Sequence, residues 1–118
     1  MNKRRSFIVG IKALKLSSKE KIFLKKYKPW GVILFNRNIK SIKQTFNLTN
    51  SIRKIFSDNR YPILIDQEGG RVSRLKNIIS FDNLTSESFG KKFLSNYKEF
   101  STYYKLFIDK TSYLLKLI

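Results

Sequence analysis

Three short apolar runs punctuate the first half of the chain, and polar residues separate them. They cover Phe7–Ile11, Gly31–Phe35 and Ile63–Ile65. Continuous apolar runs of this length, rich in β-branched residues and without polar alternation, are typical of strands that are buried on both faces. The pattern therefore predicts three buried strands, the third of them preceded by a proline that a strand tolerates at its first position.

Helical patterns lie between these runs. Ser17 and Ser41 are each followed three residues later by Glu or Gln, the spacing of a capping box, and then by apolar residues at three- and four-residue steps. This predicts helices from about Ser18 to Tyr27 and from Ile42 to about Phe56. Strands that alternate with helices are characteristic of βαβ units. We therefore expect an α/β fold with a parallel sheet.

The last third of the chain has a helical period from Phe89 to Ile118. After a loop at residues 80–84, it predicts a long helix that continues almost to the last residue. We expect Trp30 and the apolar stripe Phe100–Ile118 to be core residues. The stripe could equally dock onto a missing part of the fold supplied by another chain.

Polar residues that could bind a ligand follow the third predicted strand. Ligands gather at the carboxyl ends of parallel strands, and Asp66 lies there. Gly69 and Gly70 permit a tight turn and a close approach of backbone to a ligand. The polar side chains around them are Gln67, Glu68, Arg71 and Arg74. Position alone leaves two interpretations open: a ligand site, or a scaffold in which Asp66 caps a turn and pairs with Arg71 or Arg74.

Arg37 also lies at the carboxyl end of a predicted strand, in the polar loop Asn36–Asn38. It could face a site at that edge of the sheet. An arginine in this position more often ties one loop to another, and we favour this supporting role.

Composition narrows the functional classes. The chain has 118 residues, the size of one domain, with 42% hydrophobic residues and a net charge of +17. It contains neither Cys nor His, which excludes thiolate metal sites, disulfides and the commonest acid–base group. We expect no cofactor or metal. No apolar run reaches the ~18 residues of a membrane span, and no signal-peptide pattern is complete, so we expect a cytoplasmic protein.

The positive charge raises an alternative, a small protein that binds nucleic acid or an anionic membrane. Ten Lys and Arg residues against one Glu lie within residues 1–28. No nucleic-acid-binding motif is present, however, and the sequence shows no aromatic platform interleaved with basic residues. We favour a general compositional bias towards lysine as the source of the charge.

Two segments together resemble a known family. Trp30–Asn38, followed about thirty residues later by the Asp-Gln-Glu-Gly-Gly-Arg string in Asp66–Leu75, is similar to the amino-terminal part of the family 3 glycoside hydrolases. The resemblance extends from about Phe7 to Phe93. Within the family it is strongest to the β-N-acetylhexosaminidases that remove N-acetylglucosamine from peptidoglycan fragments in cell-wall recycling. It implies a (β/α)8 TIM barrel and a retaining reaction on a sugar substrate.

The resemblance also implies roles for particular residues. Asp66 and Arg74 correspond to the Asp and the second Arg that bind sugar hydroxyls in the family. The acid–base His and the nucleophilic Asp of the family lie in later segments, and this chain has no His. We therefore expect residues 1–118 to form the amino-terminal part of a barrel domain, a partial barrel with three strands and their helices, truncated before the catalytic loops. Catalysis would then need a complementary carboxy-terminal fragment.

One segment departs from the family pattern. The family has a proline-containing stretch after the arginines, whereas residues 77–84 of this chain contain no proline. This suggests relaxed selection on that loop.

Overall fold

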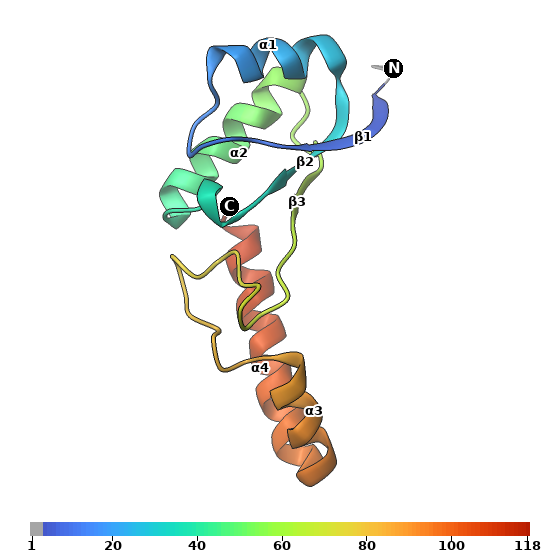
Figure 1. The fold of residues 1–118 in the computed structure, drawn as a ribbon, viewed down its shortest axis with the longest axis vertical. Helices are drawn as coiled ribbons and strands as arrows, with labels where there is room; N and C mark the ends of the chain where they lie inside the picture. Colours follow the sequence, from blue (N-terminus) through green and yellow to red (C-terminus); the bar gives the residue numbers. More distant parts are fainter. Residues whose placement is uncertain (1–3) are drawn as a thin grey trace.

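The computed structural model describes residues 4–118 and has an α/β architecture (Figure 1). Its elements in chain order are β1 (Arg5–Gly10), α1 (Ser18–Tyr27), β2 (Pro29–Leu34), the 3-10 turn η1 (Asn36–Asn38), α2 (Ile42–Phe56), β3 (Ile63–Ile65), α3 (Ser86–Ser95) and α4 (Tyr97–Lys116). The bounds of α1, α2 and β3 confirm the predictions from sequence.

The three strands form one parallel sheet in the order β1-β2-β3. The first two strands begin two residues earlier than predicted, at Arg5 and Pro29, and end one residue earlier. The reason is backbone pairing: the N–H of Arg5 donates to the carbonyl of Lys28 at 2.8 Å, which extends the ladder beyond the apolar runs. The predicted alternation of strands and helices is confirmed.

Only one face of the sheet is covered by helices. Val9, Val32 and Leu34 pack with residues of α1 and α2 in the hydrophobic core. Alternate residues point the other way, and Ile8 on that face is 45% exposed. The prediction that the first strand is buried on both faces is therefore wrong, because the described chain supplies no layer for the second face.

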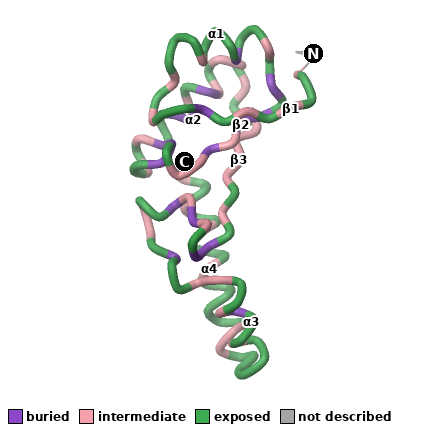
Figure 2. Tube along the Cα trace, in the orientation of Figure 1, coloured by how far each residue is buried: buried purple, intermediate pink, exposed green. Residues whose placement is uncertain are grey.

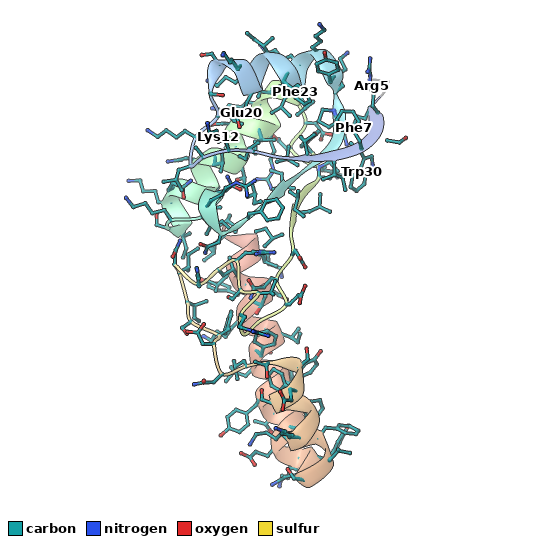
Figure 3. All side chains as sticks on the ribbon, viewed as in Figure 1. Arg5, Phe7, Lys12, Glu20, Phe23 and Trp30 are labelled. Carbon is teal, nitrogen blue, oxygen red and sulfur yellow. The ribbon has the colours of Figure 1, made fainter. Side chains whose placement is uncertain are left out.

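The N-terminal caps of α1 and α2 differ in detail. Ser17 and Glu20 form the predicted capping box at the start of α1, and Glu20 also accepts from the backbone N–H of Lys12 at 2.8 Å (Figure 3). Partial burial acts to raise the pKa of Glu20, but these backbone hydrogen bonds outweigh it and hold the pKa below its usual value. At α2, Ser41 accepts from Gln44 N–H, whereas the Gln44 side chain bonds Lys40 N–H instead, so the predicted second box is incomplete.

The long helix predicted from Phe89 onwards is broken at Asn96. The Asn96 side chain accepts from the N–H of Glu99 and so caps α4, while its own N–H donates to Lys92 and ends α3. The two helices fold back on each other as a hairpin (Figure 1). Its aromatic residues pack among themselves, with Phe89 edge-on to Tyr104 at 5.1 Å between ring centroids.

The expectation that Trp30 and the apolar stripe of the last helix are core residues is largely wrong. Trp30 is 47% exposed, and no residue of α4 is buried. Figure 2 colours most residues of both hairpin helices as exposed. Only the end of the stripe is buried, because Ile118 packs beside Leu34 in the core and its carbonyl accepts from the Thr49 hydroxyl.

Residues 4–118 form an elongated molecule, with extents of 53 × 28 × 20 Å and a radius of gyration of 16.8 Å. A compact domain of this length would have a radius of gyration of about 13.5 Å. The hairpin projects from the sheet and accounts for the length (Figure 1). Across the described residues, every helix is too short or too polar to cross a bilayer.

Candidate functional site

The carboxyl ends of the three strands meet at one edge of the sheet, and Phe35 lies at its centre. The Arg37 and Arg74 guanidinium carbons lie 4.6 and 5.4 Å from the centre of the Phe35 ring. Gly10 at the end of β1 makes room for this arrangement, because a Cβ there would lie 3.1 Å from the ring. The fold thus brings residues from three strand ends together.

Asp66 and Arg74 form an ion pair at this edge. Arg74 Nη2 lies 3.6 Å from Asp66 Oδ2, and the side chains are 25% and 47% exposed respectively. A pair this open contributes about 0–1 kcal/mol to stability. Within residues 4–118 no hydrogen bond engages the Asp66 carboxylate. Its oxygens therefore remain free to accept hydrogen bonds from a ligand.

Gln67 fixes the backbone that carries Arg74. Its side-chain oxygen accepts from the N–H groups of Arg74 at 2.8 Å and Leu75 at 3.1 Å, and its amide donates to the buried Ser73 hydroxyl. The next residues return the chain sharply, since the N–H groups of Glu68 and Gly69 both donate to Val72 O. The turn holds Arg74 against the end of β3.

Gly69 and Gly70 are required by the backbone of this turn. Both have positive φ, +93° and +53°. A Cβ at Gly69 would lie 2.5 Å from Leu84 O, and one at Gly70 would lie 2.6 Å from Thr85 Cγ2. The two glycines therefore bring the loop close to the start of α3, a structural role that does not depend on any ligand.

Three asparagines at this edge have supporting roles that the sequence analysis missed. Asn36 donates to Arg74 O at 3.3 Å, and Asn77 donates to Ile39 O at 2.6 Å. Asn38 is fully buried, and its amide donates to the carbonyls of Ile11 and Ala13. These bonds join loops far apart in sequence. An asparagine in a loop gives no signal by itself, so only the fold reveals them.

Arg37 joins two loops, which is the supporting role favoured from its sequence position. Its Nε donates to the carbonyl of Ile11 at 3.0 Å and so joins the loop after β2 to the loop after β1. Glu68 and Arg71 are exposed and form no ion pair with other residues of the range 4–118. Of the two arginines that sequence position offered to Asp66, Arg74 is therefore the one that pairs with it.

This arrangement suits recognition of a polar, uncharged ligand better than metal binding. An ionised carboxylate accepts from hydroxyl groups, and a guanidinium donates in a fixed fork. Among residues 4–118 there is no group of three or more acidic side chains that could hold a metal ion.

Comparisons with known proteins show which proteins the chain resembles. A β-hexosaminidase of Alkalilimnicola ehrlichii is 42% identical over 71 residues, which cover 58% of this chain and 20% of the relative. A β-hexosaminidase of Psychromonas ingrahamii is 38% identical over 72 residues, which cover 61% and 21%. No protein-family profile matches the chain. The resemblance to glycoside hydrolases of the hexosaminidase class is thereby confirmed.

Solved structures make the resemblance more specific. NagZ of Neisseria gonorrhoeae in complex with N-trifluoroacetyl-D-glucosamine is 35% identical, with a TM-score of 0.56 over 64% of this chain and 22% of that one. The native enzyme matches with 36% identity and a TM-score of 0.54, over 60% and 20%. The chain is thus similar to part of a NagZ-type hexosaminidase. It spans about a fifth of the length of the relatives it matches.

Proposed function

We propose that this chain carries part of the sugar-binding site of a family 3 β-N-acetylhexosaminidase, on the first three strands of a (β/α)8 barrel. The observation that carries the proposal is the Asp66–Arg74 pair, which lies at the carboxyl end of the sheet in a chain similar to NagZ. Asp66 accepts hydrogen bonds from two hydroxyls of a terminal N-acetylglucosamine, and Arg74 donates to a neighbouring hydroxyl. Glu68, Gly69, Gly70, Arg71 and Arg37 support the site loop.

The substrate class follows from the same resemblance. The NagZ of Neisseria gonorrhoeae binds an N-acylated glucosamine analogue. We assign terminal β-linked N-acetylglucosamine of peptidoglycan fragments to this site, with cell-wall recycling in the cytoplasm as its setting. The reaction is hydrolysis of an O-glycosidic bond.

The catalytic groups of a retaining glycosidase are a nucleophilic carboxylate and an acid–base group close together. The 118 residues contain no His, and Glu68 is an exposed side chain on the tight turn of the site loop. Residues 1–118 therefore bind the sugar without cleaving it. A carboxy-terminal barrel fragment that adds strands beside β3 would supply the missing groups.

Sugar binding is tested by titrating the isotope-labelled chain with N-acetylglucosamine and following backbone amide resonances. We expect shifts confined to residues 35–37 and 66–75. Asp66→Asn should weaken binding roughly tenfold or more, because hydrogen bonds to a charged group contribute about 1.5–3 kcal/mol. Asp109→Asn, an exposed position on α4, changes the charge equally and should leave binding unchanged. Unperturbed resonances around Asp66 at saturating sugar would refute the assignment.

Catalysis is tested with a chromogenic N-acetylglucosaminide. The 118-residue chain alone should show no turnover above the uncatalysed rate. Addition of a purified fragment that contains the remaining barrel strands of a close relative should produce turnover, and Arg74→Ala should abolish it. Hydrolysis by the chain alone would show that the essential groups have been assigned wrongly.

A further inference from the structure

Two adjoining hollows lie at the amino-terminal ends of the strands, opposite the edge that carries Asp66. The larger, of about 660 Å³, is lined by Arg4, Lys25, Lys28 and Trp30 and by residues 55–58 at and just after the end of α2. The second, of about 540 Å³, is lined by residues 4–5 and 26–28. Each volume is within the range of small-ligand sites. Because Arg4 and Lys28 line both, they form one continuous depression, which we call the basic hollow.

The basic hollow carries a surplus of positive charge. Among the described residues, its cations are Arg4, Arg5, Lys25, Lys26 and Lys28, and its only carboxylate is Asp58. Asp58 is already neutralised by an ion pair with Arg4. The other four cations form no ion pair within the described chain. The hollow therefore favours an anionic ligand.

The helix dipole explains only part of this charge. Lys25 and Lys26 lie in the last turn of α1, where cations are favoured in any protein. Lys28 is the C-cap residue of α1 and is favoured by the dipole in the same way, whereas Arg5 lies in β1 and is not at a helix end. The helix dipole therefore does not explain why Arg5 lies beside the three lysines.

An exposed indole occupies the same place. Trp30 lies on the helix-covered side of the sheet, but beyond the ends of α1 and α2, so it lines the hollow with Ile55 and Phe56 and remains 47% exposed. Arg5 and Trp30 project from the starts of β1 and β2 (Figure 3). On the neighbouring wall, Arg5 and Lys26 lie 5.6 and 5.4 Å from the centre of the Tyr27 ring.

We propose that the basic hollow is a binding site for single-stranded nucleic acid, with a base stacked on Trp30 and phosphates held by Arg5, Lys25 and Lys28. Proteins that bind single strands combine a positively charged groove with aromatic side chains on which bases stack. Trp30 lines the hollow beside the ends of α1 and α2 with 47% of its surface exposed, so a planar base can stack on it. The sequence does not reveal this platform, because residues 4–5, 25–30 and 55–58 meet only in the fold.

The test uses the full chain and a labelled oligothymidylate of about eight nucleotides, within the range of known single-strand site sizes. Fluorescence anisotropy gives the dissociation constant, and emission of Trp30, the only tryptophan, reports stacking directly. We expect quenching of Trp30 and a dissociation constant that rises with salt, with a log–log slope of about 2 for three phosphate contacts. Trp30→Ala should weaken binding about tenfold, and Arg5→Ala should lower the slope by about 0.7.

Matched controls separate a site from general charge. Lys105→Ala removes an equal charge from an exposed position of α4, and Tyr113→Ala removes an exposed aromatic ring that is 60% accessible. Both should leave binding and its salt slope unchanged. If Lys105→Ala weakens binding as much as Arg5→Ala, the net charge alone is responsible and the proposal fails. It also fails if phosphatidylserine vesicles bind the chain and the oligonucleotide does not.

This proposal is independent of the sugar site, because the two lie at opposite ends of the strands. Amide resonances of residues 66–75 should not shift on addition of the oligonucleotide. Trp30→Ala should leave N-acetylglucosamine binding unchanged, and thermal unfolding of each variant verifies that it is folded. Loss of sugar binding with Asp66→Asn would say nothing about the basic hollow.

Discussion

At the scale of single residues, backbone geometry constrains the candidate site more tightly than its ion pair does. The Asp66–Arg74 pair is partly open to solvent and weakly stabilising. Gly69, by contrast, adopts a backbone conformation that costs other residues about 1–2 kcal/mol, before any steric contact is counted. The turn therefore fixes where Arg74 lies, and the charges are left available for a ligand.

Gly69→Ala should destabilise the protein by more than this 1–2 kcal/mol, because the new Cβ would also lie 2.5 Å from Leu84 O. Urea unfolding followed by circular dichroism measures the change. Gly90→Ala is the matched control: Gly90 lies within α3 with no atom near its Cβ position, so alanine should stabilise the helix by about 1 kcal/mol. Equal effects of the two substitutions would contradict the observed turn.

Tyr61 makes the folding stability of the chain depend on pH in the alkaline range. Burial raises the pKa of its phenol to about 12, and its hydroxyl donates to Pro29 O at 2.9 Å. An unfolded tyrosine has a pKa of about 10. Since the folded value is the higher one, this contribution to stability is complete below pH ~10 and is lost as pH rises towards ~12.

Tyr61→Phe should therefore be less stable than the parent chain near neutral pH, by about 1 kcal/mol for the lost hydrogen bond. The difference should shrink between pH ~10 and ~12. Urea midpoints at several pH values measure it. Tyr113→Phe, on the exposed face of α4, should follow the parent chain at every pH. A constant difference between Tyr61→Phe and the parent would mean that Tyr61 titrates like a free tyrosine.

At the scale of helices and strands, the sequence predicts those features that depend on local interactions. The bounds of α1 and α2 follow from Ser17 and Ser41, whose caps are formed within three residues of each helix start. The break at Asn96 escaped prediction because aromatic residues on both sides keep one helical period, and the period is the same whether they pack on a core or on each other. The burial of Ile8 and Trp30 depends on which helices or strands cover them, and the local sequence pattern does not contain this information.

The hairpin of α3 and α4 depends on Phe89, the only buried residue of α3, which contacts Phe100, Tyr104 and Phe107. Phe89→Ala should cost about 3 kcal/mol. Because the hairpin projects from the sheet, we expect amides of α3 and α4 to lose protection from hydrogen exchange while those of α2 keep it. Leu94→Ala, on a side chain that is 86% exposed, should change neither. Uniform loss of protection would show that the hairpin and the sheet unfold together.

The position of the candidate site could be predicted from the sequence, because it follows from the parallel arrangement of the strands. Asp66 lies directly after an apolar run, and parallel strands place such residues at one edge, so its position followed from the pattern alone. The pairing of Asp66 with Arg74 instead of Arg71 was not decided by sequence, because it depends on the Gln67 hydrogen bonds that orient the turn. The loop ties made by Asn36 and Asn38 likewise depend on contacts across the sheet.

At the scale of the whole molecule, an open sheet and an outlying hairpin define the shape. Half of the sheet surface lacks a helical layer, as the exposure of Ile8 shows, and α4 contributes no buried residue. Exposed apolar surface of this kind is typical of an interaction site. The net charge of +17 opposes association of two copies of the chain.

Small-angle scattering of the 118-residue chain should give a radius of gyration near 16.8 Å, against about 13.5 Å for a compact domain of this length. Raising the salt concentration separates shape from charge repulsion, since screening would contract a chain that is expanded by its charge. We expect the value to remain the same in high salt, because α4 is anchored by Phe107, which packs edge-on against Phe81, and by Ile118, which lies in the core directly after the helix. With a complementary barrel fragment, the complex should become compact for its mass. A chain that contracts to about 13.5 Å in salt would have its hairpin folded against the open face of the sheet.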